Sequence, residues 1–128
     1  MWIFTSNGFL SAVEHRDKPG YLMVRARARE HLVGLAQRMG EQPEYTPGAD
    51  YEWRVTITRK SFEGFVLEQI KNIDYDNFKN SISTNAAKRV QEGLEVDADL
   101  VGDYHYACGE VWQAMWSFQA MRPPHCSE

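Results

Sequence analysis

The stretch Leu22-Met23-Val24-Arg25-Ala26-Arg27-Ala28-Arg29 alternates apolar and basic residues with a period of two. Successive side chains of a β-strand point to opposite faces, so this pattern predicts a strand with an apolar face and a basic face. A second run, Glu52-Trp53-Arg54-Val55-Thr56-Ile57-Thr58, alternates in the same way. If both strands lie in one sheet, its outer face carries Arg25, Arg27 and Arg54 beside threonine hydroxyls.

The rest of the chain predicts both strands and helices. Asn7-Gly8 lies between two short apolar runs and is typical of a β-hairpin, because both residues tolerate positive φ. Pro43, Pro47 and Gly48 predict a loop between the two alternating runs. Apolar residues at steps of three and four predict helices elsewhere. The predicted strands are 2–5, 9–13, about 21–28 and 51–59; the predicted helices are 29–39, 61 to a turn at 72–74, 75 to about 79, 86–93 and about 97–121.

Three further local predictions concern where helices begin, break and end. Ser61 is the expected N-cap of the helix that follows the second alternating run. Ser81-Ile82-Ser83-Thr84-Asn85 consists largely of poor helix formers, so we expect a break there. Pro123 and Pro124 end the last helix, because proline cannot continue one.

The order of the segments, β-β-β-α-β-α-α, favours an α+β fold. We expect an antiparallel sheet of about four strands with helices on one face. A ferredoxin-like variant is the nearest named arrangement. The sequence contains no internal repeat or linker, so we expect a single domain over residues 1–128.

Composition limits the classes of protein that fit. The chain has 128 residues, a net charge of -4 and 12% aromatic residues, which fits a folded domain and disfavours non-specific binding to duplex DNA. Its two cysteines, Cys108 and Cys126, form no disulfide framework and suit a reducing compartment. We find no signal-peptide pattern and no run long enough to cross a bilayer, so we expect a cytoplasmic protein without membrane contact.

Short strings along most of the chain carry a family resemblance. They are Met1-Trp2-Ile3-Phe4-Thr5 with Gly8-Phe9 and Ser11, Val24-Arg25-Ala26-Arg27, Asp50-Tyr51 with Arg54-Val55, Ile73-Asp74-Tyr75-Asp76-Asn77-Phe78-Lys79, and Tyr104-His105 with Val111-Trp112. In these strings the chain resembles a family of small uncharacterised proteins from bacteria and their phages. The resemblance implies a cytoplasmic single domain without an established activity, and it implies that part of residues 84–103 is an addition here.

The arginine face is the leading candidate site. A guanidinium group offers a rigid fork of donors that suits phosphate or carboxylate, and Thr56 and Thr58 would add neutral hydrogen bonds. Aromatic residues of the hairpin would stack on a base, as open sheets do when they bind nucleotides or single strands. The alternative is that these arginines only keep an exposed sheet face solvated, in surface pairs with Glu14, Glu30, Asp50 or Glu52.

A second candidate is the string Tyr75-Asp76-Asn77-Phe78-Lys79. In a helix, Tyr75 and Lys79 would be neighbours at i and i+4. Binding would then use the Tyr75 hydroxyl, the Asn77 amide and the Lys79 ammonium together. The alternative is a helix start in which Asp76 suits the positive end of the helix dipole.

The last predicted helix has an unusually wide apolar stripe. Trp112, Met115, Trp116 and Phe118 place aromatic and thioether surface within two turns. Such a stripe fits either a core or an interface, where Trp and Met are enriched. A dimer or partner contact through Trp112, Met115 and Trp116 is therefore a further expectation.

Metal and catalytic patterns are weak. His105 and Cys108 are three residues apart, but the other two ligands would be the adjacent His125 and Cys126, which is no recognised zinc spacing. The sequence shows no catalytic serine or cysteine signature and no glycine-rich phosphate loop. We therefore predict no metal site, no cofactor and no catalytic residue.

Together these patterns favour a non-enzymatic binding protein. It would use Arg25, Arg27 and Arg54 to engage a nucleotide, a single-stranded nucleic acid or an acidic protein surface. The phage resemblance extends this expectation to an inhibitor of host defence, which would cap a host protein or sequester a nucleotide signal. The alternative is a structural or adaptor protein that dimerises through its C-terminal helix. An enzyme acting on a phosphorylated substrate ranks last, because no acid–base pair is recognisable.

Overall fold

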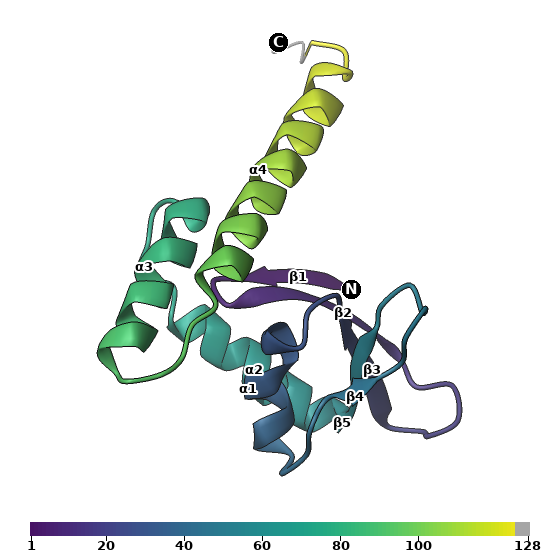
Figure 1. The fold of residues 1–128 in the computed structure, drawn as a ribbon. Helices are drawn as coiled ribbons and strands as arrows, with labels where there is room; N and C mark the ends of the chain where they lie inside the picture. Colours follow the sequence, from purple (N-terminus) through teal and green to yellow (C-terminus); the bar gives the residue numbers. More distant parts are fainter. Residues whose placement is uncertain (125–128) are drawn as a thin grey trace. The chain divides into compact units, whose positions relative to one another are not determined.

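The computed structural model describes residues 1–124. The chain divides into two compact units, Met1–Asp76 and Asn77–Glu128. The first unit is a sheet with two helices, and the second is a pair of helices (Figure 1). The single domain expected over residues 1–128 stays a prediction, because compactness of the parts does not decide whether they fold together.

The first unit contains one five-stranded antiparallel sheet, which confirms the α+β class. Its strand order is β1-β2-β3-β5-β4, so the first three strands form a meander. About four strands were predicted. The additional strand is β4, which has two residues and lies in the segment predicted to be a loop. The strands are β1 (Trp2–Thr5), β2 (Gly8–Glu14), β3 (Tyr21–Ala26), β4 (Glu44–Tyr45) and β5 (Trp53–Thr58).

Both helices of this unit cover the same face of the sheet. Helix α1 (Glu30–Arg38) and helix α2 (Arg59–Lys71) bury their apolar residues against alternate residues of β2, β3 and β5. The alternation in the two strands follows the sequence pattern, because Val24 and Val55 pair across the strands and are both buried. The core consists of Leu10, Ala12, Val24, Ala26, Leu32, Leu35, Ala36, Val55, Ile57 and Phe62.

The structure does not confirm a ferredoxin-like arrangement. That motif follows the order β-α-β-β-α-β. In this chain the order is β-β-β-α-β-β-α-α-α, so the helices do not alternate with the strands in that way.

The hairpin between β1 and β2 forms as predicted, but by a different mechanism. Neither Asn7 nor Gly8 has a positive φ. Instead, the Thr5 hydroxyl oxygen accepts hydrogen bonds from the backbone N–H groups of Asn7 and Gly8, both at 3.1 Å. Gly8 is needed for another reason, because a Cβ at this position would overlap the ring of His31 on α1. His31 also accepts a hydrogen bond from the Phe9 N–H through Nδ1 at 3.2 Å, which ties the hairpin to the helix.

Helix α2 begins two residues earlier than predicted. Its N-cap is Thr58, whose side chain accepts a hydrogen bond from the Ser61 N–H at 3.1 Å. The prediction of Ser61 as N-cap is therefore wrong. A threonine at the end of a strand can serve this purpose because an N-cap residue keeps extended backbone angles, as Thr58 does.

The second unit contains helix α3 (Phe78–Gln91) and helix α4 (Ala98–Ala120), which pack against each other. The predicted break at residues 81–85 is wrong. The Ser81 hydroxyl donates to the Phe78 carbonyl at 2.5 Å and the Thr84 hydroxyl donates to the Asn80 carbonyl at 3.1 Å, so these side chains bond back to the helix itself. Asp97 caps the start of α4 by accepting from the Leu100 N–H at 3.1 Å, which confirms the predicted start.

None of the helices in residues 1–124 combines the length and the apolar character needed to cross a membrane.

Candidate functional site

Arg25 and Arg54 lie directly opposite each other on β3 and β5. Their neighbours in sequence, Val24 and Val55, belong to the core, so the two arginines project from the face that α1 and α2 leave uncovered. Like charges at facing positions of an antiparallel pair destabilise a sheet. Within residues 1–124, neither arginine forms a salt bridge to a carboxylate. The sheet therefore carries two facing positive charges, with Glu44 of β4 opposite Arg54 on its other side but outside salt-bridge distance.

Tyr51 is the centre around which the arginines are arranged. Its ring is buried, and the guanidinium carbons of Arg25 and Arg27 lie 4.6 and 4.2 Å from the ring centroid. Guanidinium groups over an aromatic face are attracted by its quadrupole. We call Arg25, Arg27, Tyr51 and Arg54 the arginine–tyrosine cluster. Tyr51 is not among the predicted site residues, because extending the alternation of β5 back to residue 51 places it on the core face.

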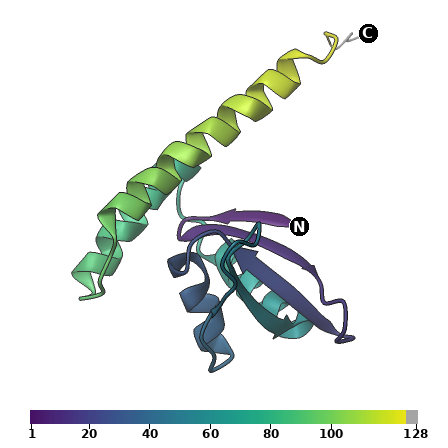
Figure 2. The ribbon, with the colours of Figure 1, turned by 45° about the vertical axis from the view of Figure 1, so that its right-hand side comes forward.

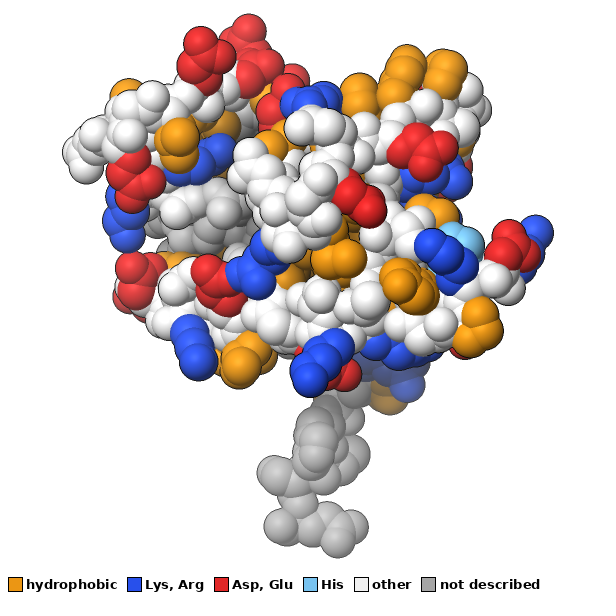
Figure 3. Space-filling view, turned by 90° about the horizontal axis from the view of Figure 1, so that it is seen from below, with side chains coloured by type: hydrophobic (Ala, Val, Ile, Leu, Met, Phe, Trp, Pro, Cys, Tyr) orange, Lys and Arg blue, Asp and Glu red, His pale blue; other side chains and the backbone are white. Residues whose placement is uncertain are grey.

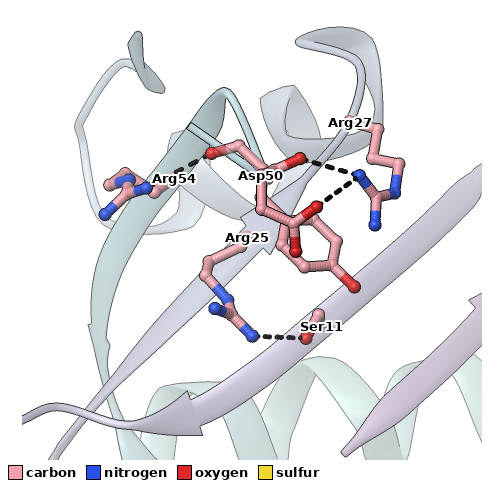
Figure 4. Close-up of polar contacts among 6 residues, drawn as sticks. Ser11, Arg25, Arg27, Asp50 and Arg54 are labelled. Carbon is pink, nitrogen blue, oxygen red and sulfur yellow. Dashed lines mark hydrogen bonds and ion pairs between the residues drawn. The ribbon is translucent and has the colours of Figure 1, made fainter. Parts of the chain in front are cut away.

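Hydrogen bonds within the unit occupy part of each guanidinium (Figure 4). Arg25 donates from Nη2 to the Ser11 hydroxyl at 2.9 Å, and Arg54 donates from Nη2 to the Tyr51 carbonyl at 3.2 Å. The Nε atoms of both Arg25 and Arg54 are buried without a hydrogen-bond partner among the described residues. A guanidinium has five N–H donors, so both groups retain donors that the protein does not satisfy.

Arg27 differs from the other two arginines because it has a carboxylate partner. It donates from Nη1 to the Asp50 carbonyl at 2.7 Å and to the Asp50 carboxylate at 3.2 Å. The two side chains are 54% and 80% exposed, so solvent screens the pair and it contributes little stability. Figure 4 shows Arg25, Arg27 and Arg54 around the Asp50–Tyr51 segment and not converging on one point. The predicted pairing of an arginine with Asp50 is thus found for Arg27 alone.

Aromatic side chains of the hairpin continue the same face. Phe4 stacks on Phe9 at a centroid distance of 4.5 Å, and Trp2 meets Phe9 edge-on at 5.7 Å. Phe9 lies 6.4 Å from the Tyr51 ring, which joins these rings to the arginine–tyrosine cluster. Trp2 is 70% exposed, so its ring is open to a ligand. We call Trp2, Phe4 and Phe9 the aromatic run.

The two threonines of β5 have different roles. Thr56 pairs with Met23 across the strands and lies on the same face as Arg54. Thr58, in contrast, caps α2, and its hydroxyl also donates to the Ser61 hydroxyl at 2.9 Å. Of the two threonine hydroxyls expected beside the arginines, Thr58 is therefore already engaged elsewhere.

A second tyrosine lies at the sheet edge. The Tyr45 hydroxyl donates to the Glu52 carboxylate at 3.2 Å, and its ring lies 4.6 Å from that of Trp53. The negative charge of Glu52 and this hydrogen bond raise the pKa of Tyr45 above its ordinary value.

The string from Tyr75 to Lys79 does not form one helical face. Helix α3 starts only at Phe78, so Tyr75 precedes it and the expected i, i+4 pair of Tyr75 with Lys79 is wrong. The Asn77 carboxamide caps α3 by accepting from the Asn80 N–H at 3.1 Å. The Lys79 ammonium lies 5.3 Å from the centroid of the Trp112 ring. Asn77 and Lys79 belong to the second unit, whereas Tyr75 and the arginines belong to the first. A ligand-binding role for Tyr75, Asn77 and Lys79 stays a prediction. The helical spacing of Tyr75 and Lys79 that suggested it is not present.

Cys108 is buried in the pair of helices. Burial raises the pKa of the Cys108 thiol, and a hydrogen bond with Tyr104 opposes this effect only in part. Among residues 1–124, no three histidine, cysteine or acidic side chains are grouped so that they could hold a metal ion. His125 and Cys126, the other candidate ligands, lie outside the described residues.

The second half of α4 is apolar and uncovered within its unit. Six large apolar side chains from Val111 to Met121 are between 39% and 78% exposed: Val111, Trp112, Met115, Trp116, Phe118 and Met121. No Asp, Glu, Lys or Arg occurs between Val111 and Met121. We call this segment the α4 overhang, since α4 continues past the start of α3 (Figure 2).

Comparisons with protein-family models, with curated proteins and with solved structures found no match to this chain. The resemblance to small bacterial and phage proteins therefore stays a prediction.

Proposed function

We propose that this protein is a non-enzymatic binding protein whose uncovered sheet face takes an anionic ligand with a planar ring. Nucleotides, free or within a single strand, have this chemistry. The single observation that carries the proposal is the pair Arg25 and Arg54, which face each other and form no salt bridge among the described residues, although Glu44 lies opposite Arg54 on β4. A bound phosphate would offset their mutual repulsion.

The buried, unpartnered Nε atoms support the same conclusion. Leaving a buried donor without an acceptor costs on the order of 1–3 kcal/mol, and more where the group is charged. Arg25 and Arg54 share this feature with Arg89 on α3 of the other unit. Arg25 and Arg54 differ from Arg89 because they occupy facing positions on one sheet, where one anion can accept from both.

The aromatic run supplies the second half of the ligand. Bases stack on aromatic rings at about 1–3 kcal/mol for each base, with little sequence preference. Trp2 is the most exposed ring of the run, and Phe9 connects it to Tyr51 and hence to the arginines. An exposed ring connected to the arginines supports the proposal, because open-sheet binders of single strands combine stacking with phosphate contacts.

The overall charge argues for a small anionic ligand and against duplex DNA. The chain has a net charge of -4, whereas duplex binders present extended basic surfaces. In the space-filling view, basic and acidic side chains of the described residues are interspersed over the face drawn (Figure 3). A ligand with one to three phosphates matches a local pair of arginines better than a long duplex does.

Fluorescence anisotropy with a labelled single-stranded oligonucleotide, with unlabelled mononucleotides as competitors, tests the proposal. We expect Arg25→Gln and Arg54→Gln each to weaken binding by about 10-fold, because a charge-assisted hydrogen bond is lost. Trp2→Ala should weaken oligonucleotide binding without unfolding the protein, because Trp2 is largely exposed. Arg38→Gln is the matched control, since Arg38 lies on α1 and pairs with Glu68 on α2.

Two results would contradict the proposal. One is the absence of binding to any oligonucleotide or mononucleotide at millimolar concentration. The other is binding that Arg38→Gln weakens as much as Arg25→Gln does. If the chain binds an acidic protein and no nucleotide, the arginine face is still the binding surface, but its ligand is not a nucleotide.

A structural or adaptor protein that dimerises is the second candidate, and the α4 overhang is the observation that favours it. The role as a phage-encoded inhibitor of host defence, which the resemblance suggests, stays a prediction to be tested once a ligand is known.

A further inference from the structure

Helices α3 and α4 have unequal lengths, and this leaves one end of α4 uncovered by α3. They contain 14 and 23 residues. At about 1.5 Å per residue, α4 is therefore longer than α3 by roughly 13 Å. The contact of Lys79 with Trp112 brings the start of α3 level with Trp112, so α3 covers α4 only up to about this residue. Figure 2 shows α4 continuing beyond α3.

The apolar stripe of α4 continues past the point at which α3 stops covering it. Tyr104 and Cys108 are buried in the covered half. Steps of three and four continue the same stripe to Val111, Met115 and Phe118, which are all exposed. Trp112 and Trp116 widen it on one side. The overhang thus continues the apolar surface that α3 covers on the first half of α4. Among the described residues of this unit, no other helix or strand covers that surface on the overhang.

We propose that the α4 overhang binds the α4 overhang of a second copy of this chain, in an antiparallel and two-fold symmetric pair. In this arrangement the partner's helix lies in line with α3 and covers the stripe where α3 stops. The same contact covers the partner's stripe, as two-fold symmetry requires. This inference is independent of the sheet face and of its ligand.

The area of the overhang fits such a pair. At their exposed fractions, the six large side chains leave on the order of 700 Å² of mostly apolar surface uncovered. A standard interface buries about 800 Å² on each partner. Trp and Met are also enriched in interfaces, and the overhang contains two of each.

The charges of the overhang favour a second copy over other occupants. No charged residue lies between Val111 and Met121, so two overhangs meet without repulsion even though each chain has a net charge of -4. Its polar face carries Gln113 and Ser117 and no Lys or Arg, whereas helices that lie on anionic membranes have basic residues there. The antiparallel arrangement also directs the C-terminal end of the partner's α4 towards the N-terminal end of α3, which is favourable for the two helix dipoles.

Sedimentation equilibrium of the full chain tests this inference, with light scattering after size-exclusion chromatography as a second measurement. We expect a dimer for the natural sequence. The double variant Met115→Glu/Trp116→Glu should raise the dimer dissociation constant by at least about 100-fold, because it places four carboxylates in the interface. Tyr106→Glu is the matched control, since Tyr106 is 70% exposed on the same helix but lies away from the stripe. It should leave the dimer unchanged.

A folding check and a second variant make the outcome decisive. Circular dichroism should show the same helix content for the double variant as for the natural sequence. Met115→Cys, in a background with Cys108→Ser and Cys126→Ser, should form an intermolecular disulfide under mild oxidation, because Met115 lies near the proposed two-fold axis. Three results would overturn the inference: a monomer at all concentrations, a dimer that the double variant does not weaken, or binding to anionic vesicles by a chain that remains monomeric.

Discussion

The arginine–tyrosine cluster and the α4 overhang are both exposed in part, yet they differ in how far contacts within their own unit hold their side chains in place. The cluster is held by internal contacts, because Arg25 bonds to Ser11, Arg54 bonds to the Tyr51 carbonyl and the Tyr51 ring is buried. In the overhang, Lys79 meets the Trp112 ring, but the large apolar side chains of the segment are 39–78% exposed. The difference indicates a preformed polar site on one unit and an incomplete apolar surface on the other.

The largest effect that distinguishes the two regions is on stability. Tyr51→Ala should lower the free energy of unfolding by roughly 3 kcal/mol, because it removes a buried ring and the support of two guanidinium groups. Trp116→Ala should lower it by no more than about 0.5 kcal/mol in dilute solution, since Trp116 is 55% exposed. Urea denaturation of both variants over a series of protein concentrations measures the difference. Equal losses for the two variants would show that the regions do not differ in this way.

Gly8→Ala should have the next largest effect and sharpens the description of the sheet face as preformed. A Cβ at Gly8 overlaps the His31 ring, so the hairpin that carries the aromatic run has to shift. We expect a loss of about 2 kcal/mol, typical of an overpacked position. Gly34→Ala is the control, because open space surrounds Gly34 in α1 and alanine favours a helix. Thermal unfolding should move in opposite directions for the two variants, and a neutral Gly8→Ala would show that the hairpin is not tied to α1.

Thr58→Ala tests where the site ends. Because Thr58 caps α2, its loss should lower the free energy of unfolding by about 1 kcal/mol and leave oligonucleotide affinity unchanged. Thr56→Ala should show the reverse pattern, a small change in stability and a lower affinity, since Thr56 lies on the arginine face. Chemical denaturation and anisotropy on the same two samples separate these effects. A loss of affinity in Thr58→Ala would extend the site to the end of β5.

The smallest expected effect concerns the covered half of α4. Burial raises the pKa of Cys108, so less reactive thiolate is present at any given pH than for an ordinary cysteine. In a Cys126→Ser background, alkylation of Cys108 should be several-fold slower than that of a free thiol at pH 8 and should accelerate as the pH rises further. Stopped reactions analysed by mass spectrometry give the rate. Reaction as fast as that of a free thiol would show that the two helices do not shield this residue.

The alternation of β3 and β5 could be predicted from the sequence. A shift of either strand by one residue would expose Val24 or Val55 and bury the arginines. The shared face of Arg25 and Arg54 follows directly from that alternation. Tyr51 could not be predicted, because it lies before β5, where the chain no longer follows the pleat of the strand. The continuous helix α3 was missed for a comparable reason, since hydroxyls of Ser81 and Thr84 bond to helix carbonyls and propensity alone does not include such bonds.

For α4 the sequence predicted the stripe and the start at Asp97, but not the length over which the stripe is covered. That length depends on where α3 begins, and α3 begins at Phe78 because Asn77 caps it. The prediction of a contact through Trp112, Met115 and Trp116 stays a prediction. The exposed apolar side chains of the α4 overhang are the physical reason to expect this contact.

The salt dependence of oligonucleotide affinity tests the central claim most directly, namely that the sheet face binds anions through Arg25 and Arg54. Affinity should fall linearly on a double-logarithmic plot, with a slope of about -1.4 for two phosphates neutralised on a single strand. Arg25→Gln should reduce the magnitude of this slope by about 0.7, and Arg38→Gln should not change it. An affinity that does not depend on salt, or a slope that Arg25→Gln leaves unchanged, would contradict the account.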